Sequence, residues 1–207
     1  PARRGRRASR RVELGPVRFS RGAAVRTDDE IAVMRRAGRV VAEMHDRIRA
    51  AIGPGVSTGE LDRIARQVLA DRGATSNFLH YGSPPYPAVI CASPNSMVVH
   101  GIPSDDVVLA EGDLISIDCG AVIDGWHGDA AFTAGVGEVA PEVARLIQVT
   151  EAALDAAIQV MVADNRLGDI GHAVESTAEA AALHVVGGYT GHAIGRAMHE
   201  SPNVPNV

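Results

Sequence analysis

The sequence predicts a mixed α/β fold, of the α+β type, that consists of two similar halves. Helical patterns come in two pairs, and each pair is followed by segments with the character of strands. Corresponding helix breaks, at Gly53 and Asn165, lie 112 residues apart, so the halves share the order of their elements although not their residues. A turn pair, Asp124-Gly125, joins two strand segments near the middle of the chain, as expected for an antiparallel hairpin. Together these observations indicate a pseudo-twofold arrangement.

The first half begins with a helix that starts at a capping box. Thr27-Asp28-Asp29-Glu30 has the required pattern, and apolar residues follow at helical spacing until Gly53-Pro54-Gly55: Ile31, Met34, Val41, Met44, Ile48 and Ile52. A second helix is expected from Ser57 to Gly73, with these side chains facing inward: Leu61, Ile64, Val68 and Leu69. A loop rich in Gly, Pro and Tyr follows over 81–87, and a short strand is expected at 88–92.

The second half repeats the helix pair and then stops early. One helix is expected from Pro141 to about Asn165, and another from Leu167 to about 182. The first pair is followed by 66 residues of strand and loop, whereas only 23 residues follow the second pair. About 43 residues of the expected second sheet are therefore missing. We expect a truncated, incomplete second half, in which strand edges and apolar helix faces lack cover.

Composition and length place the chain among globular proteins. Its 207 residues are 46% hydrophobic, which is enough for a substantial core. No apolar run reaches the roughly 18 residues of a membrane span, and the N-terminus lacks the apolar segment of a signal peptide. The two cysteines, Cys91 and Cys119, are too few for a disulfide framework. We therefore expect a cytoplasmic protein with no membrane contact.

The charge is unevenly distributed along the chain. The formal net charge is −5, yet residues 1–22 carry eight of the 20 arginines and only one glutamate. A basic segment of this kind can contact RNA or a ribosomal surface. It shows no signal for a helix or strand, so a solvated, disordered tail is the simpler interpretation. We expect a tail over 1–22 and one folded domain over 23–207.

Two acids, Asp118 and Asp129, flank the turn of the expected hairpin. The segments 114–117 and 130–133 have the character of strands, and a turn centred near Asp124 places the two acids almost opposite each other. Two carboxylates this close in an apolar sheet repel each other and lose hydration unless a cation lies between them. A hard divalent metal would resolve this conflict, although an isolated pair of acids can equally cap turns.

Four motifs of the chain combine acids, histidines and glycines. They are Val99-His100-Gly101-Ile102-Pro103, Ile117-Asp118-Cys119-Gly120, Gly125-Trp126-His127-Gly128-Asp129, and Gly191-His192 followed by Met198-His199-Glu200. In order and approximate spacing, over about residues 27–207, the chain resembles the type I methionine aminopeptidases in their actinobacterial form. The resemblance implies the pita-bread fold, in which two pseudosymmetric α/β halves surround a central sheet.

The resemblance also implies a metal site. Asp118, Asp129 and His192 match ligands of two divalent ions, with Asp129 bridging both. Such a donor set accepts Co, Mn, Fe or Zn, so the sequence leaves the metal open. The family's site contains two further glutamates, one of which is the proton shuttle, and neither has a counterpart in this sequence. With three of five ligands, residues 1–207 by themselves are expected to be inactive and poorly stable.

The remaining matched residues are implied to bind the substrate. His100 and His199 match the histidines that hydrogen-bond the substrate's amide and carbonyl, and His127 matches no ligand. Three residues fall where the family builds the pocket for the methionine side chain: Tyr86, Cys91 and Met198. The implied activity is metal-dependent removal of the initiator methionine from proteins and peptides, including nascent chains, whose second residue is small. The enzyme is expected to be a monomer.

Two alternatives remain open. The chain could be a catalytically inactive member of the fold that binds a ribosome, RNA or protein, with its arginine-rich tail as the contact. It could also be a related metallopeptidase, such as a proline-specific one. The Val-His-Gly-Ile-Pro and Met-His-Glu motifs favour the aminopeptidase over the proline-specific enzyme. The residues that would decide between an active and an inactive protein are the two glutamates that the sequence lacks.

Overall fold

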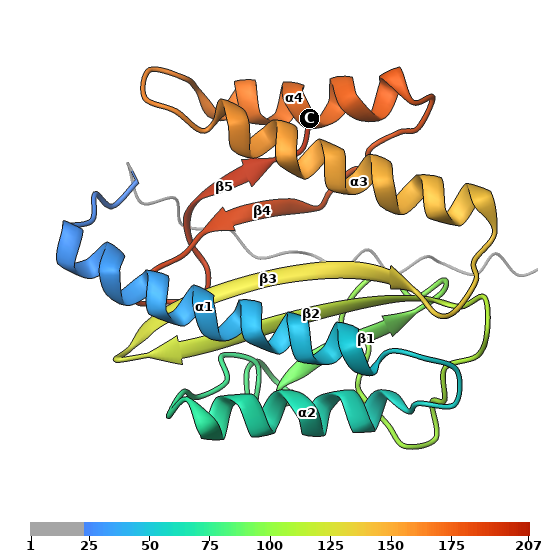
Figure 1. The fold of residues 1–207 in the computed structure, drawn as a ribbon. Helices are drawn as coiled ribbons and strands as arrows, with labels where there is room; N and C mark the ends of the chain where they lie inside the picture. The colour runs from blue at the N-terminus through green and yellow to red at the C-terminus, as the bar shows by residue number, and fades with distance from the viewer. Residues whose placement is uncertain (1–22) are drawn as a thin grey trace, which may run out of the picture.

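A computed structural model describes residues 23–207, which form two helix-and-strand halves (Figure 1). In chain order the elements are α1 (Asp28–Ala51), α2 (Thr58–Asp71), β1 (Ile90–Pro94), β2 (Leu114–Ile123), β3 (Trp126–Gly135), α3 (Pro141–Val160), α4 (Leu167–Ala180), β4 (Thr190–Ala193) and β5 (Glu200–Pro205). A helix pair followed by strands occurs twice, which confirms the predicted fold class. The expected tail over 1–22 lies outside the described residues. Between residues 23 and 207, no helix is long and apolar enough to cross a membrane.

The first half holds the main core. β1, β2 and β3 form an antiparallel sheet in that order, α1 packs on β2 and β3, and α2 packs on α1. Both helices begin at the predicted caps, because the Thr27 hydroxyl accepts the Glu30 N–H and the Ser57 hydroxyl accepts the Glu60 N–H. Ile31 was expected to face inward but is 41% exposed. It lies in the first turn of α1, before the stretch that contacts the sheet.

The β2–β3 hairpin is longer than predicted, and its register differs from the prediction. Asp124 and Gly125, with φ of 51° and 75°, form a two-residue turn directly between Ile123 and Trp126. Positive φ at both positions is typical of the type I′ turn, whose twist matches that of the strands. Asp129 therefore faces Gly120, and Asp118 faces Ala131.

The acids were predicted to lie almost opposite each other, and the structure places them further apart in register. Asp118 and Asp129 lie two register positions apart, because the turn is centred between residues 124 and 125 rather than on Asp124. An offset of two keeps both side chains on the same face of the sheet, since side chains alternate along a strand. The pair therefore still converges, along a diagonal.

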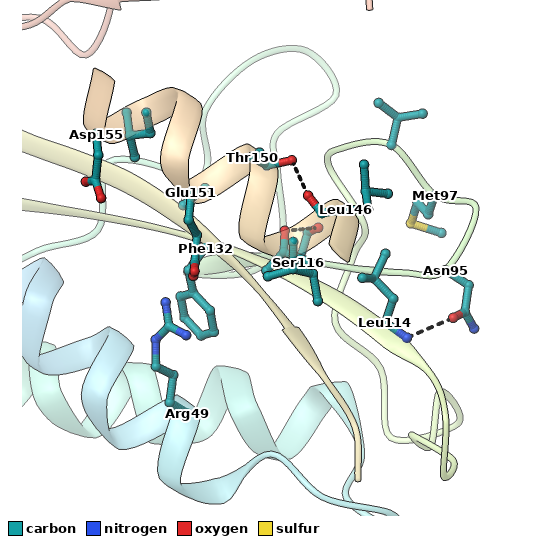
Figure 2. Close-up of a pocket in the computed structure, with 15 residues that line it drawn as sticks. Arg49, Asn95, Met97, Leu114, Ser116, Phe132, Leu146, Thr150, Glu151 and Asp155 are labelled. Carbon is teal, nitrogen blue, oxygen red and sulfur yellow. Dashed lines mark hydrogen bonds between the residues drawn. The ribbon is translucent and has the colours of Figure 1, made fainter. Parts of the chain in front are cut away.

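The second half is less thoroughly packed than the first. α3 and α4 pack on each other, and β4 and β5 form a separate two-stranded sheet beside α4, in the upper part of Figure 1. Large apolar side chains of α3 remain about half exposed: Leu146, Leu154 and Ile158. A cavity of about 630 Å³ lies along this helix. Figure 2 shows residues that line it, among them Arg49, whose guanidinium group lies over the ring of Phe132. The apolar stripe of α3 thus lacks cover among the described residues, as expected.

Candidate metal and peptide site

One cavity, of about 490 Å³, is lined by residues from both halves of the molecule. Its walls come from the loop before β1, from the β1–β2–β3 sheet, and from the segment around β4. It is lined by all eight residues to which the sequence assigned a role: Tyr86, Cys91, His100, Asp118, Asp129, His192, Met198 and His199. The tertiary structure therefore brings every predicted site residue together, and their individual roles stay predictions.

Asp118 and Asp129 form the acidic part of this cavity. Burial and, after it, the negative charge of Asp129 raise the pKa of Asp118 to about 7, while His100 and His192 act in the opposite direction. Burial raises the pKa of Asp129 to about 6, although a hydrogen bond shared with Asp118 offsets part of this effect. Asp129 Oδ1 is buried and has no hydrogen-bond partner among the described residues. The protein thus holds two carboxylates where neither is well solvated.

His192 brings an imidazole to the same place. Its Nε2 lies 3.8 Å from Asp129 Oδ2. Its Nδ1 lies 3.1 Å from the carbonyl oxygen of Ala193, so Nδ1 carries the proton and donates it there. This contact leaves the lone pair on Nε2, the nitrogen nearer to the acids, which is the arrangement that metal-binding histidines usually adopt.

The chemistry of these donors fits a divalent metal. Between residues 23 and 207, no three His, Cys, Asp or Glu side chains already stand close enough together to hold an ion. The three predicted ligands nevertheless supply what a cation requires: a buried carboxylate oxygen without a partner, a second carboxylate beside it, and a free imidazole nitrogen. These three side chains form part of a set of metal ligands. A small movement of His192 toward the acids, together with further oxygen donors, would complete the set.

An apolar wall adjoins the acids. Phe78, Cys91 and Met198 form a buried cluster, and Tyr86 packs against it. Tyr86 Oη lies 3.0 Å from the Ile90 carbonyl oxygen and 2.8 Å from the Gly101 carbonyl oxygen, which holds its ring in place. Burial raises the pKa of Tyr86 above its usual range and that of Cys91 to about 11, so both stay neutral at physiological pH. A wall of aromatic rings and sulfur atoms favours a thioether as its ligand.

His100 projects from a fixed backbone. It adopts a φ of 62°, which is uncommon for a residue with a side chain. The next residue, Gly101, is tied to β1 by two hydrogen bonds, from its N–H to the Ser93 hydroxyl and from the Ala92 N–H to its carbonyl oxygen. A Cβ on Gly101 would come within 2.1 Å of the Ala92 carbonyl oxygen, so only glycine fits there. These contacts determine where His100 stands in the cavity.

His199 meets two other rings of the cavity. Its ring centroid lies 4.3 Å from that of His192, and its Nδ1 lies 3.1 Å from Tyr81 Oη. Burial lowers the pKa of His199, and the neighbouring His192 and His100 lower it further. A neutral imidazole is therefore favoured at this position.

The sequence did not identify the residues that hold the Met198-His199 segment in place. Glu200 accepts hydrogen bonds from the backbone N–H groups of Arg196 and Ala197, at 2.8 and 3.1 Å, and forms an ion pair with Arg26. The ring of Trp126, at the start of β3, contacts the guanidinium groups of both Arg26 and Arg196. This cluster joins the chain before α1, the hairpin and the second half, so no local sequence signal could have found it.

His127 lies outside the cavity lining. Its backbone N–H donates to the Gly195 carbonyl oxygen at 2.9 Å, and this hydrogen bond links β3 to the segment after β4. Its Nδ1 is buried without a partner among the described residues, and burial lowers the pKa of the ring. That His127 is not a ligand stays a prediction.

Comparison with known proteins gives the family. The profile of metallopeptidase family M24 matches residues 32–207. Methionine aminopeptidase 1 of Mycobacterium tuberculosis is 50% identical over 199 residues, which cover 93% of this chain and 74% of the relative. The crystal structure of methionine aminopeptidase from Rickettsia prowazekii matches with a TM-score of 0.84 at 39% identity, over 88% of this chain and 73% of that one.

A more distant match shows the fold alone. The Xaa-Pro dipeptidase from Bacillus anthracis has a TM-score of 0.73 at 23% identity, over 88% of this chain and 49% of that one. The nearer matches confirm both the pita-bread fold and the resemblance that the four motifs indicated. The chain therefore belongs to metallopeptidase family M24 and, within it, to the group of the methionine aminopeptidases.

Proposed function

We propose that the protein removes the initiator methionine from proteins and peptides whose second residue is small. The observation that carries the proposal is one cavity that combines a buried acid pair and a histidine with a wall of sulfur and aromatic side chains. The acids suit metal-dependent hydrolysis, and the wall suits a thioether. Relatives that bear the name methionine aminopeptidase, at up to 50% identity, support the same activity.

The proposed cofactors are two divalent metal ions, drawn from Co, Mn, Fe and Zn. Asp118, Asp129 and His192 would hold them, and the buried Asp129 Oδ1, which has no hydrogen-bond partner in the described part of the chain, would be available as a donor. When bound, such ions lower the pKa of a water molecule and polarise a carbonyl group.

The side chains of the cavity bind and orient the peptide. The methionine side chain lies against Tyr86, Cys91 and Met198, which exclude water from it. His100 hydrogen-bonds the peptide's amide, and His199 donates to the carbonyl oxygen, where negative charge develops during attack. A donor whose bond strengthens in the transition state raises turnover more than binding.

The proposed setting is the cytoplasm, with nascent chains as substrates. The two cysteines are free and buried, which is the state expected of a reducing compartment. The arginine-rich segment 1–22 would attract the phosphates of ribosomal RNA. We propose that the protein is a monomer.

The two alternatives have less support. An inactive binding protein would not need buried carboxylates with raised pKa values beside a thioether-compatible wall. A proline-specific enzyme is favoured only by matches at the level of the fold.

The test is a metal titration followed by a peptide assay of the complete gene product. Calorimetry with Mn²⁺ should show binding, and methionine should be released from Met-Gly-Met-Met but not from Met-Lys-Met-Met. The second peptide is the matched control, because only the second residue differs. Equal release from both peptides would contradict the proposed specificity. Tight metal binding with no release from either peptide would favour the inactive alternative.

A further inference from the structure

Tyr81 contacts His199 from a part of the chain far away in sequence. The phenolic oxygen lies 3.1 Å from His199 Nδ1, and the two ring centroids lie 5.8 Å apart. Both residues line the cavity that holds the acid pair. Tyr81 is neither a proposed metal ligand nor part of the proposed methionine pocket, so its contact with His199 requires a separate explanation.

The loop that carries Tyr81 is tied to itself. The Tyr81 N–H donates to the Phe78 carbonyl oxygen at 2.9 Å, and the Tyr86 N–H donates to the Tyr81 carbonyl oxygen at 2.8 Å. The His80 N–H closes the same loop by donating to the Tyr86 carbonyl oxygen at 2.7 Å. Tyr81 therefore has a fixed backbone, although its residue is 52% exposed.

The hydrogen bond constrains the proton on His199. A neutral imidazole has one N–H and one lone pair, on different nitrogens. If the Tyr81 O–H donates to Nδ1, the imidazole proton must be on Nε2. In the reverse arrangement, the Tyr81 O–H would have no acceptor among residues 23–207, and the Nε2 lone pair would be left in a cavity that already holds two carboxylates. The first arrangement is therefore electrostatically favoured.

We infer that Tyr81 is a positioning residue, which holds His199 in the Nε2–H tautomer and aims that N–H into the cavity. Nε2 has no hydrogen-bond partner within the described part of the chain, so it is free to donate to a ligand. The inference rests on the proposed function only for the identity of that ligand, the carbonyl oxygen of the first peptide bond. Tyr81 itself touches His199 and not the reacting atoms.

The kinetic test compares two single-atom deletions in the complete gene product. Tyr81→Phe removes the hydroxyl and keeps the ring. Ser176→Ala is the matched control, because the Ser176 hydroxyl also lies within hydrogen-bond distance of a histidine, 3.3 Å from His172 Nδ1, but this pair is on α4 and does not line the cavity. We expect Tyr81→Phe to lower kcat on Met-Gly-Met-Met about tenfold, equivalent to about 1.4 kcal/mol, with KM changed less than about twofold. Ser176→Ala should change neither by more than about twofold.

A second readout does not depend on activity. Long-range ¹H–¹⁵N spectra of ¹⁵N-histidine-labelled protein, metal-free at pH 8, distinguish the two tautomers of His199, whose signal is assigned from its loss in His199→Gln. The wild type should show Nε2–H alone, and Tyr81→Phe should show a mixture of tautomers. A wild type with Nδ1–H, or a Tyr81→Phe variant with an unchanged tautomer, would overturn the inference.

The two readouts separate this inference from the proposed function. If the wild type releases no methionine, the proposed function fails, and the spectra alone decide whether Tyr81 fixes the tautomer. If the wild type is active and the tautomer shifts in Tyr81→Phe without any fall in kcat, the positioning role is overturned. A fall in kcat together with a shifted tautomer supports the inference in full.

Discussion

His192 Nε2 lies 3.8 Å from Asp129 Oδ2, although the two residues belong to separate sheets. Asp129 is on β3 and His192 is on β4, and no strand pairing joins these strands. A backbone hydrogen bond joins the same two segments, from the His127 N–H to the Gly195 carbonyl oxygen at 2.9 Å. His127 lies two residues before Asp129, and Gly195 lies three residues after His192. The contact between the acid and the imidazole is therefore made by packing of one half against the other, so an ion held there would link the two halves.

The first prediction concerns the ligand proposed to be shared. Asp129→Asn keeps the shape of the side chain but removes its charge. We expect affinity for Mn²⁺ to fall at least about 100-fold and methionine release to be abolished, because a neutral amide is a poor ligand for a hard cation. Calorimetry and the peptide assay measure the two effects. Asp46→Asn, at an exposed position on α1, is the control and should leave both unchanged. Near-normal turnover in Asp129→Asn would rule out the proposed metal site.

The second prediction concerns pH in the absence of metal. The folded pKa of Asp118 is about 7, above the ordinary value of 3.8 that an aspartate has in the unfolded chain, so folding favours the protonated form. Its stabilising contribution is complete below pH 3.8 and is lost as the pH rises through 7. From pH 5 to 7.5, the free energy of unfolding should fall by roughly 2–3 kcal/mol more in the wild type than in Asp118→Asn.

Urea unfolding in EDTA at the two pH values provides the measurement. Subtracting the variant removes the contributions of titrating groups that are distant from Asp118, since these are common to both proteins. Adding Mn²⁺ at pH 7.5 should restore the lost stability, because a cation stabilises the ionised pair. If the free energy of unfolding depended on pH equally in both proteins, folding would not raise the pKa of Asp118, and the prediction would be wrong.

The third prediction concerns the ion pair that holds the His199 segment. The Arg26 and Glu200 side chains are only 20% and 19% exposed, and Glu200 also accepts two backbone N–H groups. We expect Glu200→Gln to lower the free energy of unfolding by about 1–3 kcal/mol. A double-mutant cycle with Arg26→Met should give a coupling of at least about 1 kcal/mol.

An ion pair on the surface, again between an arginine and an acid, provides the comparison. Arg63 and Asp105 form an ion pair at 2.9 Å with side chains that are 59% and 69% exposed. Their cycle should give less than about 1 kcal/mol, since water screens the charges. Additive effects of Arg26→Met and Glu200→Gln would contradict a structural role for that pair.

The fourth prediction compares two isoleucines of one helix. Ile48 is fully buried in the core between α1 and the sheet, whereas Ile31 is 41% exposed in the first turn. Ile48→Ala should cost about 2–5 kcal/mol of unfolding free energy, because it leaves a cavity, and Ile31→Ala should cost less than about 1 kcal/mol. Chemical denaturation gives both values. Similar losses would mean that the first turn of α1 packs against something in solution.

The sequence by itself determined the elements and the chemistry of the site. Capping at Thr27 and Ser57, the helix breaks and the Asp124-Gly125 turn all depend on residues within a few positions of one another, so they can be identified without a structure. The four motifs named residues that the structure does bring into one cavity. The order of helices and strands also followed from the sequence, because apolar periodicity reflects which face of each element is buried.

Only the tertiary structure decided how these parts meet. A shift of half a residue in the centre of the turn moved Asp118 and Asp129 from almost opposite positions to a diagonal two register positions apart, and periodicity does not contain that information. The same holds for the exposure of Ile31, the bond between Tyr81 and His199, and the ion pair between Arg26 and Glu200. Each depends on which surfaces of distant segments come into contact. Such contacts are determined by the packing of the whole chain, whereas a sequence pattern records only the local preference of each segment.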